Sequence, residues 1–205
     1  MADLYLRRLE GADVVRCAEL HMEAFPGFFL SQLGPRFLRE FYKGFVGDTD
    51  GIAFVATTSS GQVVGAVVGT FEPRGFFSRL LKRRFVGFVV ASIFAVVRRP
   101  GAAPRLLKAT AYRGQVPVRV SGALLSSICV DPQEHARGIG SKLIRRFELE
   151  VRGRGMGAYL LTDSDENVAA NSFYVRNGWA LTASYQTPEG RSMNCYVLRE
   201  RGADS

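Results

Sequence analysis

Few backbone arrangements are compatible with segment 128–143, which reads ICVDPQEHARGIGSKL. An apolar run ends at Asp131 and Pro132, a short polar loop follows, and Gly138 and Gly140 lead into a stretch with helical periodicity. Glycine lets the backbone approach a ligand closely, and the first turn of a helix has N–H groups without a helical partner. The helix dipole favours an anion at the same place. The segment therefore predicts a buried strand, a loop and a helix N-terminus that together bind a phosphate-bearing ligand.

Periodicity along the rest of the chain predicts an α/β fold of one domain over residues 1–205. Strands are expected at 4–9, 52–58, 63–72, 124–130, 158–162, 179–186 and 191–198. Helices are expected at 12–24, 35–46, 138–151 and 167–177. Segment 73–117 also has a helical pattern, and it interrupts the succession of strands as an insertion.

Charge and cysteine spacing exclude two classes of site. Ten of the 27 basic residues and no acidic residue lie in 73–117, so the other 17 basic residues face 19 acidic ones. Because the basic character belongs to one segment and not to the whole domain, nucleic acid is not predicted as a partner. The three cysteines share no metal-ligand spacing with the two histidines, so no metal site is predicted.

Two motifs resemble those of the GNAT superfamily of N-acetyltransferases. Residues 135–140, HARGIG, are similar to its acetyl-CoA signature Arg/Gln-x-x-Gly-x-Gly/Ala, with His135 where the family usually has Arg or Gln. Residues 167–179, NVAANSFYVRNGW, are similar to its Asn-x-x-Ala-x-x-aromatic/Leu-Tyr-x-x-x-Gly-aromatic helix. The resemblance covers residues 50–72 and 120–198, and it covers the first 47 residues only in the order of elements.

The resemblance implies a single GNAT-type domain, in which a central, mostly antiparallel mixed sheet is flanked by helices, here with a helical insertion before the cofactor-binding strand. It implies acetyl-CoA as co-substrate, no metal, and direct transfer to an amine in one ternary complex. The cofactor-binding residues that it implies are Ile128, Cys129, Val130, His135, Ala136, Arg137, Gly138, Ile139, Gly140, Ser141 and Asn167. Tyr174 is implied as the general acid at the thioester sulfur. On the residues alone, Tyr174 equally fits an apolar core and Asn167 a helix N-cap.

The residue that takes the proton from the amine is not identified by the sequence. Glu72 ends a predicted strand, where it either faces the cleft or is solvated. Further carboxylates near plausible edges are Glu23, Asp163 and Glu166. Ser126 and Ser127 occupy the region where the family often has an acid, so a water path held by these serines is preferred. Cys129 is expected to be a small buried residue without a covalent role, and its backbone N–H region is an implied donor to the oxyanion.

The predicted acceptor side contains an aromatic loop. In the superfamily the first helices and the loop between them line the acceptor, and here that loop contains Phe25, Phe28 and Phe29. The rings are expected either to stack on an acceptor or to pack in the core. The segment is similar to a GNAT subgroup found with surface-polysaccharide synthesis, which favours a small-molecule amine or an amino sugar. A protein N-terminus or lysine side chain as acceptor, and a non-catalytic acyl-CoA-binding protein, are the alternatives.

Three interpretations fit the insertion 73–117. It is a helical subdomain packed on the core or at a homodimer interface, a peripheral contact with an anionic membrane, or a lid whose arginines meet a phosphate-bearing acceptor. Its longest apolar run, 85–97, has 13 residues, fewer than the roughly 20 that a spanning helix needs. The first residues lack a signal-peptide pattern, so a cytoplasmic protein is expected, with a membrane-peripheral location as the alternative.

Overall fold

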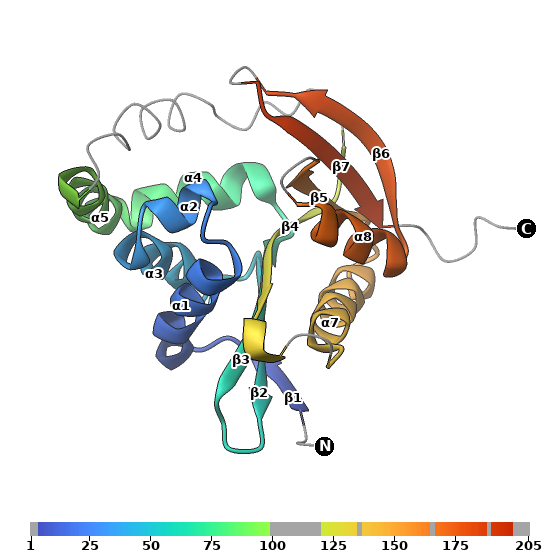
Figure 1. The fold of residues 1–205 in the computed structure, drawn as a ribbon, viewed down its shortest axis with the longest axis horizontal. Helices are drawn as coiled ribbons and strands as arrows, with labels where there is room; N and C mark the ends of the chain where they lie inside the picture. The colour runs from blue at the N-terminus through green and yellow to red at the C-terminus, as the bar shows by residue number, and fades with distance from the viewer. Residues whose placement is uncertain (1–3, 99–119, 135–136, 165–166, 188–189, 199–205) are drawn as a thin grey trace, which may run out of the picture.

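The computed structural model describes residues 4–98, 120–134, 137–164, 167–187 and 190–198 (Figure 1). Its strands are β1 Leu4–Arg8, β2 Gly51–Thr58, β3 Val63–Thr70, β4 Ala123–Val130, β5 Ala158–Asp163, β6 Trp179–Gln186 and β7 Ser192–Leu198. Its helices are α1 Val14–Ala24, α2 Phe29–Gln32, α3 Pro35–Lys43, α4 Pro73–Arg83, α5 Phe85–Arg98, α7 Ile139–Gly153 and α8 Val168–Arg176, with 3-10 turns η1 Gly11–Asp13 and η3 Pro132–Glu134. The predicted order of strands and helices is confirmed, and α2 is an additional element.

The described strands form one seven-stranded sheet in the order β1-β2-β3-β4-β5-β7-β6. Every neighbouring pair is antiparallel except β4 and β5, which run parallel. β5 pairs only with the first three residues of β4, Ala123–Leu125, whereas β3 pairs with β4 as far as Val130. The second half of β4 therefore lacks a described strand on its β5 side, and the sheet opens there (Figure 1).

A β-bulge in β4 marks the point where this opening begins. Val68 of β3 faces Ser127, and the next residue, Gly69, faces Leu125, so Ser126 is the extra residue. Because a bulge bends its strand and increases the local twist, it helps to turn the second half of β4 away from β5.

Two helical layers cover the sheet, one on each face. Helices α1, α3, α4 and α5 lie on one side of β4, and α7 and α8 lie on the other (Figure 1). All eight residues of β3 are buried because both faces are covered, which explains why VVGAVVGT lacks a polar face. Each layer has its own core, with Tyr42 and Phe76 among the largest buried side chains of the first layer and Phe147 and Trp179 among those of the second.

The described part of the insertion is fixed to the first layer by aromatic packing and by ion pairs. Phe76 of α4 lies against Phe45, with ring centroids 4.7 Å apart, and Phe88 of α5 lies against Phe37 at 4.8 Å. Three arginines pair with acids of α3 and the loop after it: Arg79 with Asp50, Arg83 with Asp48 at 2.9 Å, and Arg84 with Glu40 at 2.6 Å. The helical pattern is confirmed for 73–98, and residues 99–117 lie outside the described residues.

Replacing Gly69 by alanine should destabilise the domain. A Cβ at Gly69 would overlap the carbonyl oxygen of Leu124 and lie 2.5 Å from the Phe147 ring, so the strands beside the bulge must shift. We expect Gly69→Ala to lower the free energy of unfolding by about 2 kcal/mol, measured by urea denaturation. Gly27→Ala is the control, because a Cβ there has nothing within 4 Å. Equal stability of the two variants would contradict the tight packing of β3 on β4.

Candidate active site

The predicted strand-to-helix junction lies where β4 ends and α7 begins. Gly138 precedes α7 with φ of 72°, a left-handed conformation that strains a residue with a Cβ. The first intrahelical hydrogen bond runs from the Lys142 N–H to the Gly138 carbonyl, with an N···O distance of 3.1 Å. The amides of residues 139–141 consequently have no helical acceptor, and they can bind an anion.

Asp131 holds the loop that follows β4. Its Oδ1 accepts a hydrogen bond from the Gln133 N–H at 2.9 Å, and its Oδ2 accepts one from Arg16 of α1 at 2.7 Å. Arg16 also lies 3.1 Å from Glu23, so one guanidinium joins α1 to the loop. The Asp-Pro pair that the sequence indicates as the end of a strand therefore also orients the junction.

The two sequence motifs meet in space at Gly140 and Phe173. A Cβ built on Gly140 would lie 3.2 Å from the Phe173 ring, so the first turn of α7 lies against α8. The rings of Phe173 and Tyr174 are 5.4 Å apart. The free amides at the start of α7 and the predicted acid on α8 consequently belong to one region of the molecule.

Tyr174 is buried in the second layer but keeps its hydroxyl uncommitted. Its side chain is only 7% exposed, and its ring lies 6.3 Å from that of Trp179 and 5.8 Å from that of Tyr196. Burial, and secondarily the nearby Tyr196, raise the pKa of Tyr174 well above its usual value, so the phenol is protonated at neutral pH. Within the described ranges, no residue forms a hydrogen bond with this hydroxyl. The hydroxyl can therefore donate to a ligand.

Asn167 and Asn171 fix the start of α8 in different ways. Asn167 occupies the N-cap position without a side-chain capping bond in the described structure, and its Nδ2 lies 3.5 Å from Thr162 Oγ1. Asn171, which the sequence analysis did not single out, donates to the carbonyl oxygens of Asp163 and Asn167, both at 2.9 Å. Its Oδ1 accepts from the Tyr196 hydroxyl at 2.9 Å. Asn171 thus ties α8 to β5 and β7, while the Asn167 amide is only weakly engaged.

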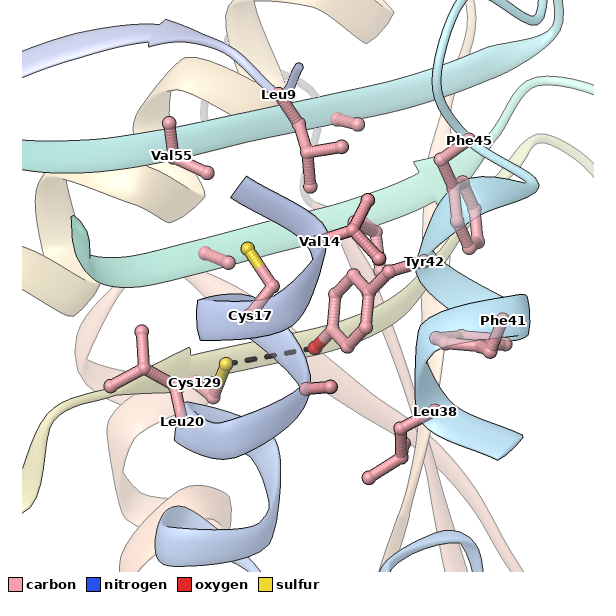
Figure 2. Close-up of a cluster of buried hydrophobic side chains, with 14 of the residues drawn as sticks. Leu9, Val14, Cys17, Leu20, Leu38, Phe41, Tyr42, Phe45, Val55 and Cys129 are labelled. Carbon is pink, nitrogen blue, oxygen red and sulfur yellow. Dashed lines mark hydrogen bonds between the residues drawn. The ribbon is translucent and has the colours of Figure 1, made fainter. Parts of the chain in front are cut away.

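A buried polar cluster on the first-layer face of β4 was not predicted. Nδ1 of His21 on α1 lies 3.1 Å from the Tyr42 hydroxyl and 3.3 Å from the Ser127 hydroxyl. The Tyr42 hydroxyl also lies 3.7 Å from Cys129 Sγ, and Figure 2 shows Tyr42 pointing from α3 toward β4. Burial lowers the pKa of His21 to about 4, so the imidazole is neutral at pH 7 and Nδ1 can accept from these hydroxyls. Burial raises the pKa of the Cys129 thiol to about 11, which keeps this buried cysteine protonated.

The carboxylates considered as proton acceptors have cationic partners. Glu72 is half exposed and lies 3.5 Å from Arg79, outside the polar cluster. Two others are similarly paired: Glu23 with Arg16 at 3.1 Å and Asp163 with Arg191 at 3.0 Å. Glu166 lies outside the described residues. The buried Ser126 hydroxyl has no hydrogen-bond partner within the described part of the chain, whereas Ser127 contacts His21.

The other predicted cofactor residues differ in how firmly they are held. Ile139 is buried, and Ile128 and Val130 are partly buried against the core under α7 and α8. Arg137 is exposed and pairs with Glu134, so its charge is partly neutralised. His135 and Ala136 lie outside the described residues.

The aromatic loop lies beside the His21 cluster. The rings of Phe25 and Phe28 are 5.2 Å apart, and Phe25 contacts the edge of His21 with centroids 5.1 Å apart. Phe25 is partly buried against the first-layer core, which supports the packing interpretation for this ring. Phe28 is half-buried, and the backbone of Phe29 opens α2.

Residues 14–179 match the Acetyltransferase (GNAT) family, which accounts for well over half of the chain. The chain therefore belongs to the GNAT family of acetyltransferases. No curated protein sequence matches it.

Solved structures of acetyltransferases share the fold. The ribosomal-protein-S18-alanine N-acetyltransferase from Escherichia coli is 16% identical, with 99% of each chain covered and a TM-score of 0.55. The polyamine N-acetyltransferase of Drosophila melanogaster is 17% identical, with 97% of this chain and 100% of that chain covered and a TM-score of 0.59. The PaiA N-acetyltransferase from Thermoplasma acidophilum, in complex with coenzyme A, is 13% identical, with coverage of 94% and 98% and a TM-score of 0.56. At these identities the likeness establishes the fold alone.

His21 should make stability depend on pH. The pKa of His21 is about 4 in the folded protein and about 6.5 when the side chain is exposed, so the unfolded chain binds a proton more readily between these values. The contribution of the neutral His21 to the free energy of unfolding is therefore complete above pH 6.5 and is lost as the pH falls toward 4. Over that window we expect the free energy of unfolding to fall by about 3 kcal/mol more in the parent than in His21→Gln, measured by urea denaturation. His135→Gln, which removes the other histidine of the chain, is the control. Parallel pH profiles for the parent and His21→Gln would show that His21 is not held neutral by burial.

Proposed function

We propose that this acetyltransferase moves an acetyl group from acetyl-CoA to a primary amine of a small molecule or an amino sugar. The observation that carries the proposal is the meeting of three features at the opening of the sheet. These are the free amides of 139–141, the half of β4 that β5 does not pair, and the uncommitted hydroxyl of Tyr174 on α8. A diphosphate fits the free amides at the start of α7, and an extended chain ending in a thioester fits the half of β4 that β5 does not pair.

Acetyl-CoA, when bound, supplies a thioester carbonyl that an amine can attack directly. The amides of 139–141 hold the diphosphate, and the unpaired backbone around Cys129 donates to the carbonyl oxygen as negative charge develops there. Tyr174 donates its proton to the sulfur as the C–S bond breaks. The proton released by the amine leaves along a water path that the Ser127 hydroxyl helps to hold, and the neutral Nδ1 of His21, 3.3 Å away, orients that hydroxyl.

The acceptor proposal rests on the aromatic character of the loop beside this cluster. The half-buried Phe28 packs on Phe25, which in turn contacts His21, so the Phe28 ring suits the apolar face of a sugar or a small amine. The polyamine enzyme and the ribosomal-protein enzyme named above share the fold although their names give different acceptors. Release of free thiol from acetyl-CoA should therefore be followed with amino sugars, polyamines and peptide N-termini in parallel.

Three free, buried cysteines fit the reducing cytoplasm that we propose for the protein.

Gly138→Ala should weaken coenzyme A binding about tenfold, because the left-handed backbone costs an alanine on the order of 1–2 kcal/mol and the junction relaxes from its binding shape. Isothermal titration calorimetry measures the affinity. Gly155→Ala is a matched control, because Gly155 has φ of 65° and open space around it at the other end of α7. If both variants kept the parent affinity, or if the parent gave no heat with coenzyme A, the cofactor site would be misplaced.

Tyr174→Phe should lower kcat by about a hundredfold while leaving the affinity for coenzyme A unchanged, because only the departing sulfur needs the phenol proton. Thiol release with the acceptor found above measures kcat, and calorimetry measures the affinity. Tyr159→Phe removes another buried hydroxyl, on β5, and serves as the control. Full activity of Tyr174→Phe would remove this residue from the mechanism.

A further inference from the structure

Helix α5 presents an apolar face to the outside of the molecule. Its exposed apolar side chains are Phe85, Val86, Val89, Val90, Ile93, Phe94 and Val97, with exposed fractions between 39% and 74%. Their spacing of one and three residues, repeated, places all of them on one side of the helix. Monomeric proteins rarely expose a contiguous apolar patch of this kind unless it binds something.

The orientation of α5 is fixed by its opposite side. Phe88, Ala91 and Ala95 are buried, and the Phe88 ring lies 4.8 Å from that of Phe37 on α3. Turning the outward face inward would expose these buried residues and break that ring contact. The apolar face is consequently a property of the folded domain.

The charges around this face are cationic. Residues 73–98, which form α4 and α5, include six basic residues and no acidic one. Among the described side chains, Lys82 is exposed near the end of α4, just before α5, and the Arg36 guanidinium lies 3.8 Å from the centroid of the Phe94 ring. The nearby acids Glu40 and Asp48 are engaged by Arg84 and Arg83.

A mostly apolar groove of about 430 Å³ continues this face. Ala91, Phe94 and Ala95 of α5 form one wall, and Met22 of α1 and Leu33 before α3 contribute to the others. Phe94, which is 45% exposed, belongs both to the groove and to the outward face. The groove therefore offers an apolar chain a place beside the cationic Arg36.

We propose that the outward face of α5 binds the surface of an anionic lipid bilayer, with the helix lying in the plane of the interface. An apolar face with a cationic rim is the combination that such surfaces bind. No helix in the described ranges is long and apolar enough to cross a membrane. The 14 residues of α5 span about 21 Å, whereas the hydrocarbon core is about 30 Å thick.

A second copy of the chain fits this face less well. A twofold dimer would bring the same surface of both copies together, so two rims of the same positive sign would face one another. Anionic headgroups instead complement the rim at the same time as the acyl region receives the apolar side chains.

Sedimentation with phospholipid vesicles tests the proposal on the full chain. We expect binding to vesicles of phosphatidylcholine mixed with phosphatidylglycerol, much weaker binding to phosphatidylcholine alone, and a loss of affinity as salt is raised. Ile93→Asn should lower the partition coefficient by about tenfold, and Phe85→Asn should do the same. Leu149→Asn on α7 is the matched control, because Leu149 is 62% exposed and Ile93 is 58% exposed.

Three results would overturn the proposal. They are the absence of binding to the anionic vesicles, equal binding of the Ile93 and Leu149 variants, and a dimer in analytical ultracentrifugation that Ile93→Asn dissociates. Coenzyme A calorimetry on the same variants shows that they are folded, and it does not depend on the lipid result.

Discussion

The short pairing between β4 and β5 is the constraint on which the candidate active site depends. A parallel strand along all of β4 would engage the backbone donors of its second half, and the start of α7 would face a closed sheet. Because pairing stops at Leu125, one edge of β4 is free inside the domain, between two covered faces. The bulge at Ser126 contributes to the same opening, and Gly69 on β3 permits the close contact of the two strands beside the bulge. The opening is therefore part of the sheet and does not require a flexible loop.

In the proposed mechanism, the two faces of β4 have different roles. On the second-layer side, α7 and α8 supply amides and a phenol, which are donors suited to an anion and a departing thiolate. On the first-layer side, His21 and Ser127 supply a neutral imidazole and a hydroxyl, which can hold a path for the proton that the amine releases. Burial shifts the two pKa values in opposite directions, upward for Tyr174 and downward for His21, and it thereby keeps both groups uncharged at neutral pH.

The sequence predicted the elements better than it predicted their contacts. The strand before the junction and the helix after it were expected at 124–130 and 138–151, and they lie at Ala123–Val130 and Ile139–Gly153, because turn residues and apolar spacing are local signals. His21 and Ser127 are 106 residues apart, and no local pattern connects a helix position with a strand position. Asp163 could likewise be named from the sequence, but its partner Arg191 is 28 residues away, and no local pattern connects the two.

The ion pairs under the insertion have an evolutionary consequence. Three arginines of the insertion form ion pairs with acids of α3 and of the loop after it. The pairs are Arg79 with Asp50, Arg83 with Asp48 and Arg84 with Glu40. A domain that gained these helices without those acids would press three guanidinium groups against a surface with no countercharge. Helices α4 and α5 and the acids Glu40, Asp48 and Asp50 should therefore be inherited together, and a relative that lacks the helices is expected to lack the acids.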